Sequence, residues 1–470
     1  MKKSNSDSGL TTQWSNRLLA AVLTALCAFS PSFAVQEQDY MLLSERNLVG
    51  TARYVGMCGA MTAIGGDPSA VLDNPAGLGL YRRMEVSLTF DYSFDKTRQP
   101  YESGISALKT NHISVPQASL VFALGNPYQL SGLLYNNVML SYHRVRTIDR
   151  KWQALGNSGN MGTLGELIAE TGVDLGIPYP AFTKNTYNDF YLEEHGFVNE
   201  FSLDWAANIS NKWYVGAGLR TMHFRLSEDA EYYEKFPLQT GDSLQQWLQN
   251  NSSVIHNGIG WKLAVGVIYR PTRWWRFGLS LTTPTLGTLR TYTSGTIKAF
   301  TDSVRYSDAP KLYEDRRGFH MPLKVSASVA SQIYDKAMIA LQYDYTHTFS
   351  SMDMHTLRAG VEVVPVSGLY LNAGYSLSIL RDRTNPHPSA NGPTRYPIDP
   401  TFDRQDTYFR TMEAGQYASF GIGYRGQAMI VQAAYQYHWQ GVELCPHKNQ
   451  IDNMRADTHR VVLTIAWHSY

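Results

Sequence analysis

Residues 261–270 read Trp-Lys-Leu-Ala-Val-Gly-Val-Ile-Tyr-Arg, and the period of two in this stretch decides the fold class. Large apolar side chains begin with Trp261 and Leu263 and occupy every second position, whereas the intervening face begins with Lys262. This alternation is typical of a β-strand whose two faces meet different surroundings. The stretch therefore predicts a strand with one apolar face turned toward lipid or a core.

The same alternation recurs along most of the chain, for example at residues 200–209, 336–345 and 429–440. The polar faces carry charges of both signs, so they must meet water or a packed interior. Counting all such runs predicts fourteen strands, at residues 84–94, 117–125, 133–146, 197–209, 212–227, 258–270, 273–283, 320–333, 336–348, 354–365, 368–380, 416–426, 428–440 and 458–468.

Short and long connections alternate between the predicted strands. Tight turns are expected at residues 125–132, 210–211, 271–272, 334–335, 366–367 and 426–427, and long segments at 95–116, 147–196, 228–257, 284–319, 381–415 and 441–457. Only the short connection at 349–353 breaks this rhythm. The rhythm predicts an all-β fold, a fourteen-stranded antiparallel transmembrane β-barrel with periplasmic turns and extracellular loops.

The composition agrees with a membrane barrel better than with a soluble enzyme. Aromatic residues make up 12% of the 470 residues, charged residues only 17%, and there are 37 glycines. Trp213, Tyr269, Trp274 and Trp467 gather near the tight turns, where a girdle of aromatic rings would lie at the lipid headgroups. The alternative is that they are ordinary strand-end aromatics of a soluble β-protein.

The first 34 residues have the pattern of a cleaved signal peptide. Lys2 and Lys3 precede a short apolar run at residues 18–29, and Ser32-Phe33-Ala34 fits a cleavage site. A lipoprotein alternative would use Cys27, but Leu26 before it is larger than such processing favours. We therefore expect export to the outer membrane of a Gram-negative cell, with outer-membrane lipid around the barrel.

Net charge and cysteine content exclude two further classes of protein. Removing residues 1–34 takes away three basic residues and one acidic residue, so the formal net charge changes from +1 to −1, which argues against a nucleic-acid partner. The mature chain would keep only Cys58 and Cys445, too few for a disulfide framework. One bridge between them stays open at this point.

No constellation of residues predicts catalysis, a metal or a cofactor. The chain has no G-x-S-x-G turn, no H-E-x-x-H helix and no Walker loop. His143, His347, His355 and His438 lack the spacing of metal ligands. The charged cluster Asp189, Glu193, Glu194 and His195 fits a solvated extracellular loop better than a catalytic site.

The segment before the first strand contains a motif with a recognisable resemblance. It reads A-R-x-x-G-M-x-G-A at residues 52–60, G-D-x-S-A at 66–70 and N-P-A-G-L at 74–78. In order and spacing these pieces resemble the N-terminal segment of the FadL/TodX family of outer-membrane transport proteins. The resemblance covers some thirty residues of the chain, and the independent strand count extends the agreement to the whole barrel.

The resemblance implies a lumen closed by residues 35–83 as a plug, with residues 84–470 forming the barrel. Asn74, Pro75, Ala76 and Gly77 match the family's N-P-A element residue by residue and are the expected plug and ligand residues. It also implies passive transport of long-chain fatty acids or other hydrophobic small molecules, with exit through an opening at a distorted third strand. A segment that only turns the chain into the first strand is the alternative to a plug.

Two further sets of residues are candidates for the transport path. The predicted third strand contains no Gly or Pro after Gly132, so Asn136-Asn137 is its only candidate for a lateral-gate bulge. Leu244, Trp247 and Leu248 lie in a predicted long loop and are apolar enough to form a ligand-entry loop, although ordinary loop packing is the alternative. A different function, binding of protein partners as a secretion-system component, would use the long loops at 147–196 and 381–415.

Overall fold

The structure is a computed structural model that describes residues 47–101, 104–125, 131–156, 187–236, 246–300, 305–307, 311–334, 336–347, 352–382, 409–412, 415–447 and 450–469. All of these residues belong to one structural unit, residues 37–470. The predicted signal peptide and the first part of the predicted plug, residues 35–46, lie outside the described residues.

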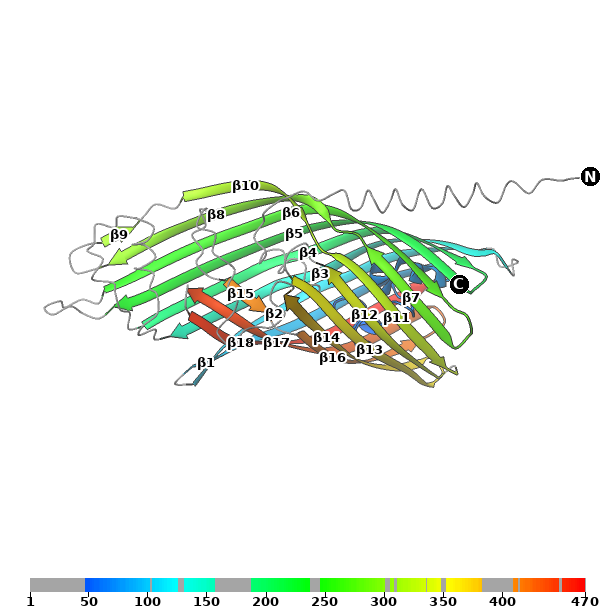
Figure 1. Ribbon diagram of the computed structural model, residues 1–470. Coiled ribbons are helices and arrows are strands. Elements are labelled where there is room, and N and C mark those ends of the chain that lie inside the picture. Colours follow the sequence, from blue (N-terminus) through cyan, green and yellow to red (C-terminus); the bar gives the residue numbers. More distant parts are fainter. Residues whose placement is uncertain are drawn as a thin grey trace, which may run out of the picture. The chain divides into compact units, whose positions relative to one another are not determined.

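The described strands form one antiparallel sheet (Figure 1). They are β1 (Glu85–Tyr101), β2 (Gly104–Gly125), β3 (Leu133–Gly156), β4 (Tyr187–Ile209), β5 (Trp213–Phe236), β6 (Gln246–Tyr269), β7 (Trp275–Thr282), β8 (Leu286–Phe300), β9 (Arg305–Ser307), β10 (Lys311–His320), β11 (Leu323–Ile333), β12 (Ala337–His347), β13 (Met352–Val366), β14 (Leu369–Asp382), β15 (Phe409–Met412), β16 (Gly415–Arg425), β17 (Met429–His447) and β18 (Gln450–His468).

The sheet closes into a barrel because β1 pairs with β2 along one edge and with β18 along the other. β7 and β8 both pair with β6 and are two parts of one wall strand, and β10 and β11 pair with them as two parts of the next. β15 and β16 likewise share β17 as a partner, and β9 pairs with β8. Counted in this way, the wall has the fourteen antiparallel strands that the alternation predicts.

The two faces of the wall have opposite polarity over the part near the tight turns. On β6, Trp261, Leu263 and Val265 point outward and are about half exposed, whereas Ala264 and Ile268 point inward and are buried. On β4, the inward residues Glu200, Ser202 and Asp204 are polar and buried. An apolar exterior around a polar interior is the reverse of a soluble protein and is typical of a transmembrane barrel.

Several strands continue well beyond this apolar belt, which corrects the predicted loop boundaries. Residues 147–156 and 187–196 belong to β3 and β4, and residues 228–236 and 246–257 belong to β5 and β6. In this extension the polarity of the faces reverses. The inward side chains form an apolar cluster between β3–β6 and β17–β18, which contains Trp152, Phe190, Leu192, Tyr232, Phe236, Leu248, Val442, Leu444 and Met454.

Residues 47–81 are almost all buried inside the barrel and form the plug, whereas Arg82 and Arg83 are exposed. They fold into helix α3 (Ala52–Gly56), helix α4 (Pro68–Asp73) and the 3-10 helix η1 (Pro75–Leu80). None of the helices among the described residues is long and apolar enough to cross a membrane.

Candidate functional site: plug, lumen and cavity

The motifs of the plug are helix starts. Asp67 caps α4 by accepting hydrogen bonds from the backbone N–H groups of Ser69 and Ala70, and Pro68 takes the first helical position. Asn74 caps η1 in the same way, accepting from the N–H of Ala76 at 3.0 Å. A capping Asp or Asn followed by Pro is a favoured helix start, because Pro has no N–H to leave unsatisfied there.

The N-P-A element also attaches the plug to itself and to the wall. The Asn74 side-chain amide donates to the carbonyl oxygen of Thr62 in the plug at 2.9 Å and to that of Val267 on β6 at 3.3 Å. Ala76 is fully buried, and Gly77 lies against Gly65, with its backbone N–H bonded to the carbonyl of Asn74. The predicted plug residues thus lie together in the lumen. Their role toward a ligand stays a prediction.

A buried ion pair fastens α3 to the wall. The Arg53 guanidinium donates from Nε to Oε2 of Glu362 at 2.6 Å and from Nη2 to Oε1 at 2.8 Å. Two parallel bonds of this kind fix both distance and orientation. Glu362 lies on β13, so the pair sets the position of the first plug helix relative to the barrel.

A second group of charges holds the end of α4. Asp73 lies 2.8 Å from Nζ of Lys324 and 3.3 Å from Nη1 of Arg358, and it accepts a hydrogen bond from the Tyr54 hydroxyl. Asp344 of the wall lies 3.1 Å from Nη2 of the same Arg358. Two basic wall residues thereby share one carboxylate of the plug and one of the wall.

The ionisable groups of the plug reflect this burial and pairing. Burial by itself lowers the pKa of Arg53, but the Glu362 carboxylate outweighs it and raises that pKa above its ordinary value. Burial raises the pKa of Asp67, against the opposing effects of Arg53 and of the Thr51 hydroxyl. Burial also raises the pKa of the Cys58 thiol to about 11. Arg53 is therefore charged and Cys58 protonated at neutral pH.

Glycines on the inner face of the wall allow the plug backbone to approach it closely. A Cβ atom at Gly216 would lie 2.5 Å from the carbonyl carbon of Pro75, and one at Gly374 would lie 2.5 Å from that of Met57. A Cβ atom at Gly266 would lie even closer to the Asn74 amide oxygen. These glycines stand near tight turns of the wall, so the plug fills the tight-turn end of the lumen.

Beyond the plug lies a cavity with about 1000 Å³ of empty space, part of it open to solvent. One side is apolar, with methionine and valine side chains from several strands. The other side is polar and includes the charged group that holds α4. The lining residues are Leu48, Val145, Val198, Met222, Lys262, Thr282, Thr285, Met321, Pro322, Lys324, Asp344, Thr346, Met354, Thr356, Arg358, Ser376, Ser378, Gly415 and Tyr417.

The wall is discontinuous between β2 and β3. These strands pair only from Gln117 to Gly125, directly after Pro116, which lacks an N–H for a ladder bond. Farther along, β3 meets side chains of the β1–β2 hairpin instead, with the Thr97 hydroxyl donating to the Lys151 carbonyl at 2.6 Å and the Thr110 hydroxyl donating to the Asp149 carbonyl at 2.7 Å. Pro116 fell within a predicted loop, so the sequence analysis missed it.

The candidate pair Asn136-Asn137 lies in β3, below this discontinuity. Asn137 is fully buried and donates to the carbonyls of Leu78 and Tyr81 at 2.8 and 2.9 Å, and Asn136 accepts from the indole N–H of Trp205. The register of β3 against β4 shifts around residues 133–135 and 144–146, so the bulges do not lie at 136–137 as predicted. A gating role of the two asparagines stays a prediction.

The remaining candidates do not converge on one site. Trp247 and Leu248 belong to β6 rather than to a loop, because the strand continues past the apolar belt, and Leu248 packs in the apolar cluster of the extension. Leu244 lies outside the described residues. Glu193 pairs with His195 on the outer face of β4, whereas Glu194 accepts from the Trp152 indole on the inner face.

Cys58 is a free, buried thiol that contacts the Ser419 hydroxyl at 2.9 Å, so it forms no bridge with Cys445. Within the described ranges, no group of three His, Cys, Asp or Glu side chains has the arrangement of a metal site.

Solved structures of known proteins share the fold of this chain. No protein-family model matches the chain, and no curated protein matches it in sequence. Among solved structures, a Pseudomonas aeruginosa FadL homologue has a TM-score of 0.54 at 14% identity, covering 90% of this chain and 99% of its own. The Pseudomonas putida toluene transporter TodX has a TM-score of 0.56 at 13% identity over 90% and 99% of the two chains. The monoaromatic hydrocarbon channel CymD gives 0.52 at 14% identity over 91% and 99%.

At these identities the likeness establishes the architecture. Both the strand count and the plug inside the lumen agree with it. The chain therefore has the fold of the FadL homologue and TodX, a plugged fourteen-stranded barrel.

Proposed function

We propose that this protein is an outer-membrane channel that lets hydrophobic small molecules cross passively. The observation that carries the proposal is the cavity between the plug and the extension of the barrel, since one of its sides is apolar. Solved structures with the same fold include a FadL homologue, a toluene transporter and a monoaromatic hydrocarbon channel, which supports the same class of cargo.

The apolar side of the cavity suits cargo of varied shape. Val145 and Val198 provide fixed apolar surface, and Met222 and Met321 provide flexible side chains that adapt to different molecules. Burying an apolar molecule here gains about 0.8 kcal/mol per CH₂ group, which is enough to extract it from water without another energy source. A molecule that has bound in this way crosses the membrane down its own concentration gradient.

Long-chain fatty acids and small aromatic hydrocarbons both meet this description. The cations near the cavity are engaged with carboxylates, as in the pairs Lys262–Glu200 at 2.5 Å and Lys324–Asp73 at 2.8 Å. A neutral hydrocarbon therefore meets no unbalanced charge on its way. Comparing the uptake of oleate with that of toluene distinguishes a fatty acid from an aromatic hydrocarbon as the cargo.

Two exits are open to the cargo. The plug fills the tight-turn end of the lumen, so cargo leaves either after the plug moves or sideways through the wall. We assign the sideways route to the discontinuity between β2 and β3, because wall pairing ends at Gln117 and side-chain hydrogen bonds replace the ladder beyond it. This route extends the lateral-gate hypothesis from Asn136-Asn137 to the strand edge above them.

The test is uptake of toluene and of oleate into proteoliposomes that contain the purified protein. Met222→Glu places a charge on the apolar side of the cavity and is expected to abolish uptake. The matched control is Met222→Leu, which keeps the same position apolar. Equal uptake by the wild type and the Met222→Glu variant would overturn the proposal.

The alternative function, a secretion-system component that binds protein partners, gains no support from the structure. Residues 187–196 of its first loop form part of β4, and residues 383–408 of the second lie outside the described residues.

A further inference from the structure

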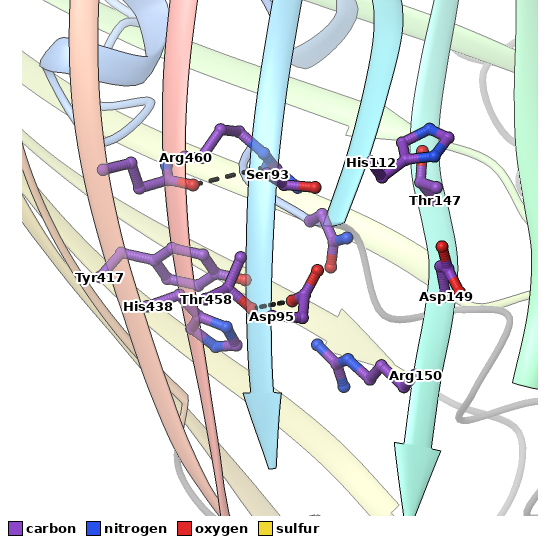
Figure 2. A pocket seen from close by; sticks show the side chains of 12 residues that line it. Ser93, Asp95, His112, Thr147, Asp149, Arg150, Tyr417, His438, Thr458 and Arg460 are labelled. Carbon is purple, nitrogen blue, oxygen red and sulfur yellow. Dashed lines mark hydrogen bonds between the residues drawn. The ribbon is translucent and has the colours of Figure 1, made fainter. Parts of the chain in front are cut away.

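The strands β18, β1 and β2 continue above the apolar belt as neighbours, because β1 pairs with β18 along one edge and with β2 along the other. Their inner side borders a polar pocket, where Asp95 of β1 accepts a hydrogen bond from the Thr458 hydroxyl of β18 (Figure 2). His112 of β2 lines the same pocket. Successive side chains of a strand point to opposite faces, so the residues next to these three point outward.

The outward side chains of these strands form rows whose character changes with distance from the belt. In the order β18, β1 and β2, the rows are Val461, Tyr92 and Ile113; then His459, Phe94 and Asn111; then Asp457, Lys96 and Lys109; then Arg455, Arg98 and Ala107. The first row is exposed and largely apolar, as expected where lipid surrounds the barrel. Positive charge begins two rows farther on, about 14 Å along the strand, at the level where lipid head groups would lie.

Like charges face each other directly within the basic cluster, which consists of Lys96, Arg98, Lys109 and Arg455. Lys96 lies opposite Lys109 on β2, and Arg98 lies opposite Arg455 on β18. Like charges directly opposite each other on neighbouring strands destabilise a sheet. An anion bound between the pairs removes that cost, so the register of these strands favours an anionic ligand.

The one carboxylate inside the cluster is already engaged. Oδ2 of Asp457 lies 3.1 Å from Nη2 of Arg98, and Oδ1 lies 2.9 Å from Nε of Arg455. The Asp457 side chain has no exposed surface, so a ligand meets the cations that cover it. Lys96 and Lys109 form no ion pair with the part of the chain that the structure describes.

The neighbouring outer surface does not neutralise the cluster. Glu443 of β17 lies one strand farther, opposite Asn453. On the side of β3 and β4, Lys151 and Glu193 pair with each other at 2.9 Å. When Glu443 is counted together with Asp457, the four cations of the cluster still outnumber the carboxylates on this part of the described outer face. The surplus charge there is positive.

We propose that the basic cluster binds the phosphate groups of a phosphorylated glycolipid in the outer leaflet of the membrane. Neighbouring strands lie about 4.8 Å apart and same-face residues about 7 Å apart, so the Cα atoms of the cluster fall within about 12 Å of one another. This area suits two phosphates carried by one sugar head group. The apolar row that begins with Val461 lies on the same outer face and provides the surface for the acyl chains of the same molecule.

The inference rests on the proposed outer-membrane location, with the extended ends of the strands outside the cell. It commits to a membrane lipid because the cluster lies on the outside of the wall, above lipid-facing residues and away from the lumen. A soluble anion would gain nothing from that apolar row.

The test measures binding of diphosphoryl lipid A to the purified full-length protein in detergent by microscale thermophoresis. The double variant Lys96→Gln/Lys109→Gln is expected to raise the Kd about tenfold or more, because two charge-assisted contacts to phosphate are lost. Neither lysine has an ion-pair partner, so the substitution leaves no carboxylate uncompensated. Lys96→Arg/Lys109→Arg keeps both charges and should bind nearly as well as the wild type.

The matched control is Lys212→Gln/Lys336→Gln, which removes two exposed lysines at the tight-turn end of the barrel. It makes the same change in net charge and should leave the Kd unchanged. Dephosphorylated lipid A, as a second probe, should bind the wild type about tenfold more weakly or worse. The heat-induced gel shift of each variant confirms that the barrel has folded.

The proposal is overturned if Lys96→Gln/Lys109→Gln binds diphosphoryl lipid A as the wild type does, or if the dephosphorylated lipid binds equally well. Equal affinity for phosphatidylglycerol would overturn the assignment to a glycolipid, because that lipid carries a phosphate without the sugar head group. Toluene uptake should be unchanged in the lysine variant. Failure of the lipid site is therefore distinct from failure of the proposed channel function, which is tested by Met222→Glu.

Discussion

Arg53 of the plug and Glu362 of strand β13 form a two-point ion pair, 2.6 Å from Nε to Oε2 and 2.8 Å from Nη2 to Oε1. The two residues are 309 positions apart in sequence. The pair links the plug to the wall. Because both side chains are buried, replacing either one alone leaves the charge of the other buried without a partner.

Arg53→Met is expected to release the plug. It leaves the Glu362 carboxylate buried and uncompensated, which costs about 3–5 kcal/mol of the free energy that holds the plug in place. The measurement is maleimide labelling of Cys58, in a Cys445→Ser background, together with single-channel conductance. The double variant Arg53→Met/Glu362→Gln should restore part of the protection, and an unrestored double variant would contradict the pairing argument.

Gly374→Val is expected to displace the plug through steric conflict. Its Cβ would lie 2.5 Å from the carbonyl carbon of Met57 and 2.7 Å from the backbone nitrogen of Cys58, closer than non-bonded atoms pack. The plug must move, so conductance should rise while the barrel still assembles. Ala373→Val is the matched control, since the neighbouring side chain points outward. Equal conductance of the two variants would show that the plug tolerates the added side chain.

The reactivity of Cys58 should depend on pH in a defined direction. Burial raises the pKa of its thiol from 9.0 to about 11, so the protonated form is favoured in the folded protein. The corresponding contribution to stability is complete below the ordinary pKa and is lost as pH rises through about 11. At pH 8, labelling in the Cys445→Ser background should be slow. Labelling as fast as that of an exposed thiol would refute the buried position.

Asn74→Ala is expected to weaken the plug by about 0.5–2 kcal/mol through loss of the η1 cap, and further through loss of its bonds to Thr62 and Val267. Asn74→Asp keeps the capping oxygen but loses the amide donor. The two variants are compared by thermal unfolding, with the labelling of Cys58 as the readout of plug release. If Asn74→Asp is as stable as the wild type, the amide bonds to the two carbonyls contribute nothing.

The barrel itself was predictable because its signal is local. Each strand of the apolar belt repeats large apolar side chains at every second position, as residues 261–269 do, and lipid on the outside makes that pattern obligatory. The helix starts at Asp67-Pro68 and Asn74-Pro75 are likewise local, since capping involves neighbours in sequence.

The length of the strands was not predictable in the same way. Above the belt, Phe190 and Leu192 of β4 point inward and Tyr191 and Glu193 point outward, so the apolar face changes sides. The alternation of apolar and polar residues continues through such a reversal, but the apolar positions now lie on the inner face instead of the outer face. Because the outer face is polar there, the sequence resembles that of a loop. The predicted loops at 147–196 and 228–257 were too long for this reason.

The residues that hold the plug also escaped the sequence analysis. Glu362, Lys324 and Arg358 fell within predicted strands, but no local pattern shows which plug residue each one meets. The inward glycines Gly216 and Gly374 had no signal that distinguished them from other glycines, because their importance comes from the backbone that approaches them.

The sequence by itself therefore determined the fourteen-stranded wall and the helix starts of the plug, because alternation and capping act between residues that are close along the chain. Only the tertiary structure decided where the plug is fastened and which glycines allow its backbone to approach the wall. Those properties arise when barrel closure brings together residues hundreds of positions apart, and their energies depend on distance and burial, which no local pattern encodes.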